Sequence, residues 1–370
     1  QVRVRGRPFR LPKPTLADIL DGVSGTINAK GRLGDRASVA RPIAPGITAQ
    51  GSGAIDAEWK LKRGVARAGS RMSLDSERFE VSLMGLRFVG SASVRSRTVR
   101  GKGGDATISN IEVPDYRLED PDNRAADVVG QGLSIEATWP GFSLVHAQRP
   151  SSLTVALPET ELRDLRVLNG LFPSQVPLSL TSGTGVVAAR LDIRDGGAAT
   201  GDLRFDADDA TLTTRGTIHQ ADLEVRATLA DGNLEERRFD FSGTTVRVSE
   251  LRDPQLNEEQ KKKLEPWYCE LGVERGDIAF RKPVALDGEF AVSMYDVRPV
   301  IGLLRGIGKP PKWLFAVPNI KDINGIFALE LDAGRTAVDD IAISGKGLEV
   351  LGWMHLQNKR GNGRVFVKYK

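Results

Sequence analysis

The 370-residue chain has one cysteine, three histidines, 6% aromatic residues and no long apolar run. Cys269 alone can form neither an internal disulfide framework nor a cysteine metal cluster. His146, His219 and His355 are far apart and never at metal-ligand spacing. No stretch of about 18 apolar residues is present to span a bilayer as a helix, and residues 1–10 lack the apolar core of a signal peptide.

Motifs of enzymes are missing as well. Glycines spaced as G-x-G recur, for example Gly51 and Gly53 or Gly130 and Gly132, but none has the third glycine of a dinucleotide fingerprint. There is no P-loop and no G-x-S-x-G nucleophile elbow. We therefore expect a non-enzymatic protein with no catalytic residues, no metal site and no cofactor, and we interpret these glycines as hairpin or bulge positions.

What the chain has instead is a tandem of short segments in which apolar and polar residues alternate. One example is Leu203, Phe205 and Ala207, which alternate with Asp202, Arg204 and Asp206. Because successive side chains of a strand point to opposite faces, this pattern predicts strands with one apolar and one polar face. Asp195-Gly196, Asp231-Gly232 and Asp287-Gly288 are expected to be tight hairpin turns between such strands.

We predict an all-β protein: an elongated, curved antiparallel sheet, shaped as a groove, with a few short helices. The helices are expected at Thr15–Asp21, at Glu159–Phe172 with Leu162, Leu165 and Leu168 on one face, at Val297–Gly306, and in a short turn at Glu258–Leu264. The second and third of these precede comparable Pro-rich breaks and strands, over Leu171–Ile193 and Gly306–Ala333, which suggests a weak internal repeat.

Charge divides the chain unevenly. Residues 1–102 carry a net charge of +12 and residues 103–370 a net charge of −8. We expect a basic β-rich segment over residues 1–150 and a second β-rich segment over residues 151–370, possibly within one continuous sheet. The basic part could meet an anionic partner such as lipid headgroups, or its arginines could simply cover the solvent face of strands. Nucleic acid is not expected, because stacking aromatics are few there.

The segment Val155–Ile193 resembles a recurrent pattern of bacterial AsmA-like proteins, related to TamB-like and bridge-like lipid transfer proteins. The matching positions are Leu168, Asn169, Pro173, Ser182, Gly183 and Gly185. The resemblance implies a periplasmic β-rich body of a Gram-negative cell, tethered to the inner membrane by a helix that this sequence lacks. It also implies an apolar groove for acyl chains, with possible membrane-protein partners at its ends.

Removing a lipid from water is favoured by about 0.8 kcal/mol per methylene covered, so an apolar trough would suit such cargo. The predicted lipid-lining residues are Phe79, Val81, Leu83, Val187, Leu191, Leu203, Phe205, Leu223, Val225, Phe290, Val292, Phe327 and Leu329. Alternation shows that a face is covered but does not show what covers it. An ordinary closed core is therefore as good an explanation of these residues as a lipid groove. Two other functions stay open: an assembly factor of the outer membrane that binds proteins at strand edges, and a carbohydrate-active or polysaccharide-binding β-protein.

Overall fold

The computed structural model describes residues 23–33, 41–44, 47–83, 86–119, 128–143, 149–171, 178–214, 217–252, 266–279, 285–297, 320–332, 335–357 and 360–369. The chain divides into unit 1, residues 1–160 and 190–198, and unit 2, residues 161–189 and 199–370. The predicted helices at Thr15–Asp21 and Glu258–Leu264 lie outside the described residues, and so does nearly all of Val297–Gly306.

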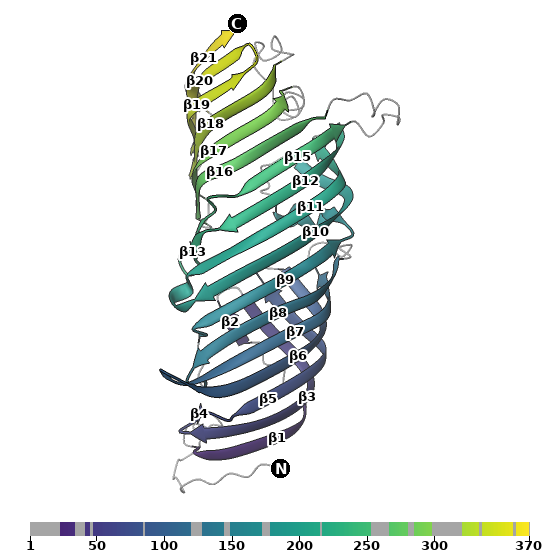
Figure 1. Cartoon of the computed structure of the whole chain (residues 1–370), viewed down its shortest axis with the longest axis vertical. Coiled ribbons are helices and arrows are strands. Elements are labelled where there is room, and N and C mark those ends of the chain that lie inside the picture. The colour runs from purple at the N-terminus through teal and green to yellow at the C-terminus, as the bar shows by residue number, and fades with distance from the viewer. Residues whose placement is uncertain are drawn as a thin grey trace. The chain divides into compact units, whose positions relative to one another are not determined.

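Unit 1 is an antiparallel sheet in which hydrogen-bonded neighbours follow the order β1, β3, β5, β6, β7, β8, with β2 and β4 paired to β3 (Figure 1). Its strands are β1 (Gly25–Leu33), β2 (Arg41–Ala44), β3 (Ile47–Lys62), β4 (Val65–Ala66), β5 (Arg71–Leu83), β6 (Leu86–Gly101), β7 (Gly104–Glu119), β8 (Val128–Pro140) and β9 (Ser152–Leu162), whose last two residues belong to unit 2. β10 (Leu178–Arg194) contributes residues 190–194 to unit 1 and the rest to unit 2.

Unit 2 is a second antiparallel ladder, in which β11, β12, β15, β16, β17, β18, β19, β20 and β21 pair in that order. A small pair, β13 with β14, joins β16 through β14. The bounds are β11 (Ala199–Thr214), β12 (Thr217–Leu229), β13 (Asp231–Asn233), β14 (Arg238–Asp240), β15 (Thr245–Arg252), β16 (Tyr268–Ala279), β17 (Ala285–Asp296), β18 (Lys321–Asp332), β19 (Arg335–Gly345), β20 (Leu348–Gln357) and β21 (Arg360–Tyr369).

The predicted all-β class and curved antiparallel sheet are thus confirmed. The helix expected at Glu159–Phe172 is wrong in its first part, because β9 continues to Leu162. The next residues form a 3₁₀ helix, η2 (Leu165–Leu171), and a second 3₁₀ turn, η3 (Asp195–Gly197), joins β10 to β11. No helix in the described part of the chain has the length and apolar character needed to cross a membrane.

Side-chain hydrogen bonds tie η2 to β10. The Asn169 side chain accepts from the Leu180 amide and donates to the Leu180 carbonyl, both at 2.8 Å, as a neighbouring strand would. Ser182 Oγ donates to Thr211 Oγ1 at 2.8 Å on β11. Gly183 has φ +124°, and a Cβ there would lie 3.0 Å from Leu165 Cδ1. Asn169, Ser182 and Gly183 thus connect η2, β10 and β11 within unit 2.

Only one of the three expected Asp-Gly turns is a turn. Gly196 in η3 has φ 77°, as a tight connection requires. Gly232 lies on β13 opposite Phe239, and Gly288 lies inside β17 opposite Gly276. At Gly288 the glycine permits close approach, because a Cβ would lie 2.6 Å from the Arg275 carbonyl oxygen. A strand interior needs glycine for space as readily as a turn needs it for φ.

Aromatic rings cover other glycines of unit 1. Gly51 on β3 lies directly opposite Phe79 on β5, and Gly130 on β8 lies opposite Tyr116 on β7. A Cβ would lie 2.4 Å from Phe79 Cδ2 and 2.2 Å from Tyr116 Cζ. These two glycines therefore leave room for aromatic rings inside strands, and the expectation that they mark hairpins or bulges is wrong for them. Gly53 does lie at a register shift of β3 against β5, as expected of a bulge glycine.

Candidate functional site: an apolar sheet face in unit 2

One face of unit 2 is apolar from β11 to β21. Residues directly opposite each other on antiparallel neighbours have their side chains on the same face of the sheet. Following these pairs across nine described strands produces a single row without a polar side chain. The row is Phe205, Val225, Val246, Leu271, Val292, Gly325, Ile343, Val350 and Val367. We call the face that carries this row the apolar face of unit 2.

Neighbouring rows of this face have the same character. Leu203 pairs with Ala227 and Ala207 with Leu223. A third row runs from Leu223 through Val248, Cys269 and Met294 to Ile323. Burial raises the pKa of the Cys269 thiol, with a smaller contribution from the nearby Glu270 charge, so the thiol stays protonated among these aliphatic neighbours.

The opposite face carries a row that is polar over the same nine strands, although the next row of that face is apolar from Gly272 on β16 to Phe366 on β21. The row one residue along from the first consists of Asp206, Glu224, Arg247, Glu270, Ser293, Asn324, Ser344, Glu349 and Lys368. Its charges pair across strands: Arg247 Nη1 lies 3.2 Å from Glu270 Oε2. Burial disfavours the Asp206 carboxylate, but hydrogen bonds from Arg204 and Arg226 outweigh this and lower its pKa. We call this the polar face of unit 2.

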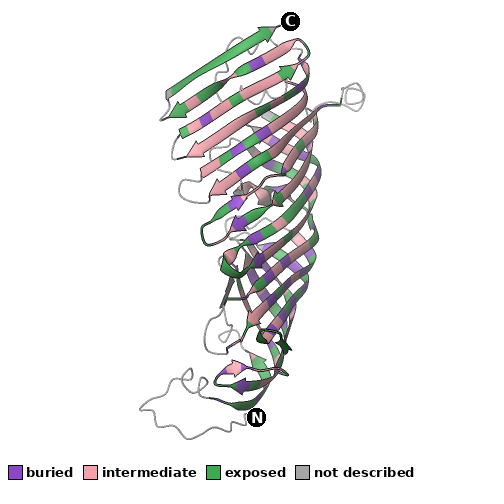
Figure 2. Cartoon of the chain, turned by 60° about the vertical axis from the view of Figure 1, so that its left-hand side comes forward, coloured by how far each residue is buried: buried purple, intermediate pink, exposed green. Residues whose placement is uncertain are grey.

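Burial along the apolar face of unit 2 is incomplete. Phe205, Phe290 and Val350 are buried, but most of the other members, including Val225 and Val292, are half-buried, and Val367 is exposed (Figure 2). A face closed beneath a second layer would show fully buried side chains. Water therefore reaches part of the hydrocarbon of this face.

The apolar face of unit 1 is different. Its central row is Ile55, Leu74, Val94, Ile111 and Ile135, and the described members with assigned burial lie at or below 9% exposure apart from Ile55. Hydroxyl pairs also lie on this face: Thr98 and Thr107 bond at 2.9 Å, and Ser96 and Ser109 at 2.6 Å. This face is a packed core with satisfied polar groups, which sets it apart from unit 2.

The predicted lining residues divide accordingly. Phe79 and Val81 lie in the core of unit 1, 4% and 2% exposed, and Leu83 is on β5 with its side chain outside the described set. Val187 and Leu191 are half-buried on β10. The apolar face of unit 2 brings together the remaining members: Leu203, Phe205, Leu223, Val225, Phe290, Val292, Phe327 and Leu329.

Residues that the sequence reasoning missed complete this face. They are Val246 and Val248 on β15, Leu271 on β16, and Ile343, Val350 and Val367 on β19 to β21. Alternation around Arg247 was a usable signal for Val246 and Val248. Leu271, Ile343, Val350 and Val367 could be assigned to this face only from the pairing register of their strands, and that register cannot be read from the sequence.

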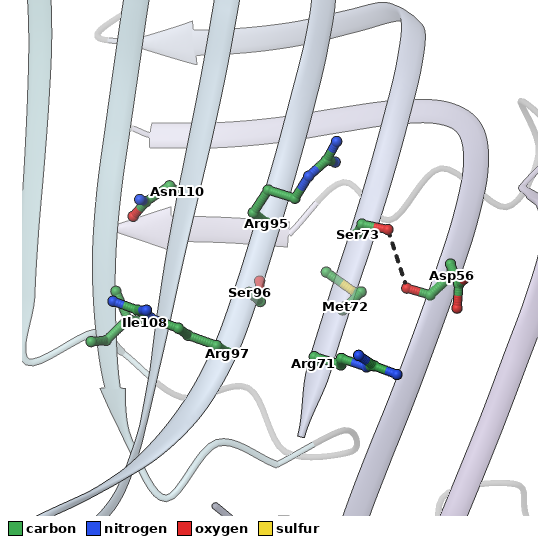
Figure 3. Close-up of a pocket in the computed structure, with 9 residues that line it drawn as sticks. All are labelled: Asp56, Arg71, Met72, Ser73, Arg95, Ser96, Arg97, Ile108 and Asn110. Atoms are coloured by element: carbon green, nitrogen blue, oxygen red, sulfur yellow. Dashed lines mark hydrogen bonds between the residues drawn. The ribbon is translucent and has the colours of Figure 1, made fainter. Parts of the chain in front are cut away.

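A hollow of about 590 Å³ in unit 1 combines charged and polar side chains (Figure 3). It is lined by Asp56, Arg71, Met72, Ser73, Arg95, Ser96, Arg97, Ile108 and Asn110. Arg71 pairs with Glu58 at 3.1 Å and Arg95 with Asp75 at 2.8 Å. Most of the positive charge here is therefore balanced, in keeping with arginines that cover a solvent face.

The histidines and acidic residues of the described part of the chain form no metal-ligand cluster. No group of three or more His, Cys, Asp or Glu side chains is placed to hold a metal ion there. His355 bonds Asp339 through Nε2 at 2.7 Å and lies against the Trp353 ring. His219 lies on β12, and His146 falls outside the described residues.

Comparison with known proteins found no matching family model, no matching curated protein and no matching solved structure.

Proposed function

We propose that this chain shields or transfers lipid without catalysing a reaction, holding acyl chains against the apolar face of unit 2. The observation that supports this most strongly is the pair of rows described above. One is apolar across nine described strands, and the adjacent one is polar across the same strands. A hydrocarbon chain needs a continuous apolar surface and no directional bond, and such a row offers that.

Partial exposure of the face supports the same function. Each methylene moved from water onto apolar side chains contributes about 0.8 kcal/mol, and the half-buried members retain surface for that contact. We further propose, from the AsmA-like resemblance, a periplasmic location in a Gram-negative cell, anchoring to the inner membrane, and a part in outer-membrane lipid homeostasis.

Photocrosslinking from matched positions tests lipid binding. A benzophenone amino acid replaces either Val292, which belongs to the apolar row, or Ser293, its neighbour on the polar face. The protein is expressed in the periplasm of a Gram-negative host, irradiated, and examined by mass spectrometry for attached phospholipid. The same comparison is repeated on β11, the first strand of the unit 2 ladder, with Leu203 on the apolar face and Arg204 on the polar face.

We expect lipid adducts from Val292 and Leu203 and few from Ser293 and Arg204. Equal labelling of both faces, or none from the apolar one, contradicts the proposal. Protein adducts from the apolar positions would instead support an assembly factor that covers this face with a partner.

A further inference from the structure

Three arginines of the hollow in unit 1 come from the neighbouring strands β5 and β6 (Figure 3). Arg71 on β5 lies directly opposite Arg97 on β6, and Arg95 lies on the same face of β6, two residues before Arg97. This face is the reverse of the packed apolar face of unit 1. Its two rows across β3, β5, β6 and β7 are Asp56, Ser73, Arg95 and Asn110, and Glu58, Arg71, Arg97 and Ile108.

The cross-strand pair of Arg71 and Arg97 is unfavourable by itself, because like charges directly opposite each other on neighbouring strands destabilise a sheet. Figure 3 shows the two side chains extending in opposite directions from their strands, which separates the two guanidinium groups. A negatively charged group bound between them would remove this repulsion. The register of β5 against β6 therefore favours an anion at this position.

Carboxylates of the chain supply only part of that negative charge. Arg71 and Arg95 each have one carboxylate partner, Glu58 and Asp75. Within the described residues, no ion pair or side-chain hydrogen bond joins the guanidinium of Arg97 to another group. The guanidinium of Arg97 is therefore available to an external anion.

The charge of the hollow as a whole has the same sign. Its lining contains three arginines and one acidic residue, Asp56, whose carboxylate lies 3.7 Å from Lys30 Nζ. The Asn110 side chain lies in the same row as Arg95 and offers amide N–H donors. A ligand with several acceptor oxygens and more than one negative charge fits these groups best.

A phosphate monoester has those properties. A carboxylate has one charge and two oxygens, and a single arginine satisfies it, as in the pairs of Glu58 and Asp75 with their arginines. A phosphate monoester carries up to two charges and has three terminal oxygens, so it can accept hydrogen bonds from several guanidinium groups at once.

The three arginines are close enough to share one phosphate. Directly opposite residues have their Cβ atoms about 5 Å apart, and residues two apart along a strand are separated by about 7 Å. Arg71, Arg95 and Arg97 are all exposed, so packing does not prevent their long side chains from turning toward a common ligand. The hollow, at about 590 Å³, has room for a phosphate together with the group that it esterifies.

We propose that the hollow of unit 1 binds a phosphate monoester through Arg71, Arg95 and Arg97, with Asn110 as a further donor. This goes beyond acyl-chain binding by the apolar face of unit 2 and does not depend on it. Soluble phosphate esters and the headgroup of phosphatidic acid share this chemistry, and the experiment separates the two sources.

The full chain is titrated in a calorimeter with glycerol 3-phosphate, and separately with malonate, a dicarboxylate. It is also floated with phosphatidylcholine vesicles that either contain or lack phosphatidic acid. The test variants are Arg97→Gln, which removes the charge, and Arg97→Lys, which keeps the charge but removes the planar pair of donors. The control is Arg78→Gln, because Arg78 is an exposed arginine of β5 outside the hollow.

We expect the unaltered chain and Arg78→Gln to bind glycerol 3-phosphate equally, and more tightly than malonate. Arg97→Gln should weaken this binding about tenfold, since a charge-assisted hydrogen bond is lost. Arg97→Lys should restore only part of the affinity. Added salt should weaken binding, because the site is open to solvent.

Circular dichroism establishes that each variant is folded. Binding of glycerol 3-phosphate that depends on Arg97 supports the proposal with a soluble ester as ligand. Flotation that requires both phosphatidic acid and Arg97, without binding of glycerol 3-phosphate, supports it with a lipid headgroup as ligand. The proposal is overturned if neither probe binds, if Arg97→Gln binds as well as Arg78→Gln, or if malonate binds as tightly as glycerol 3-phosphate.

Discussion

Phe290 on β17 and Phe327 on β18 lie directly opposite each other on the apolar face of unit 2, with ring centroids 5.3 Å apart and ring planes 15° from parallel. The pair joins two strands that are separated in sequence by residues 297–320. The two rings can stack only if β18 pairs with β17 in this register, so the contact between them is a test of the register.

A double-mutant cycle on this pair measures that contact. Phe290→Ala removes a buried ring and should lower the free energy of unfolding by about 3 kcal/mol, and Phe327→Ala, half-buried, should lower it by less. We expect a coupling energy of about 0.5–1.5 kcal/mol from denaturant titrations of the single and double variants. Strict additivity would show that the rings do not stack in solution.

A charge on the apolar face should cost more than the same charge on the polar face. Val246→Asp places a carboxylate between Val225 and Leu271, and we expect a loss of about 2 kcal/mol in unfolding free energy. Thr245→Asp, one residue away and opposite Arg226, should change stability by less than about 0.5 kcal/mol. Chemical denaturation compares the two. Similar losses would mean that the two faces do not differ in exposure to water.

Space for a side chain differs between two strand glycines of unit 1. A Cβ at Gly130 would lie 2.2 Å from Tyr116 Cζ, whereas nothing lies within 4 Å of a Cβ at Gly31. The Tyr116 ring cannot move freely, because its hydroxyl bonds Thr160 Oγ1. We expect Gly130→Ala to destabilise by about 1–3 kcal/mol and Gly31→Ala to be neutral or slightly stabilising. Thermal melts of both variants check this, and an equal effect would contradict the ring packing.

The thiol of Cys269, the only one in the chain, should react slowly with a water-soluble disulfide reagent at pH 8. Burial raises its pKa, so the reactive thiolate is scarce at that pH. The rate relative to a free cysteine should recover as the pH rises toward and above the raised pKa. If acyl chains cover the apolar face, added phospholipid should slow the reaction further. A rate equal to that of free cysteine at pH 8 would place the thiol in open water.

Asp240 links stability to pH. Ser242 donates to Asp240 Oδ1 from Oγ at 2.5 Å and from its amide at 2.8 Å, and these bonds lower the pKa of the carboxyl. Stability from a lowered pKa is present above the unfolded-state pKa of about 3.9 and is lost as the pH falls through the folded-state value. Asp240→Asn should therefore cost about 1 kcal/mol at pH 7, with the difference shrinking below pH 4. A constant difference across this range would contradict the linkage.

Much of the candidate site was predictable because strand alternation is local. Leu203, Phe205, Leu223 and Val225 were identified from spacing alone, and the register places all four on one face. The same reasoning selected Phe79 and Val81, which lie in a packed core. Spacing cannot separate these cases, since a buried face and a half-open face have the same period of two.

Two of the expected turns and the first part of one expected helix were wrong for a different reason. Asp287-Gly288 has the composition of a hairpin, but the neighbouring Arg275 carbonyl requires a residue without a side chain at Gly288. Likewise, leucines at helical spacing over Glu159–Phe172 belong partly to β9, where Leu162 is buried. Both outcomes depend on how a segment pairs and packs as a strand, which local propensity does not include.

The order of residues along each strand determined by itself that the chain forms sheet with one hydrocarbon side and one hydrated side, because pleating sends neighbours to opposite sides. Only the tertiary structure decided that Phe205 and Val367 belong to one row, and that unit 2 leaves part of this row open to water. Register and curvature arise from pairing between distant segments, and these set how much of each side chain the solvent can reach.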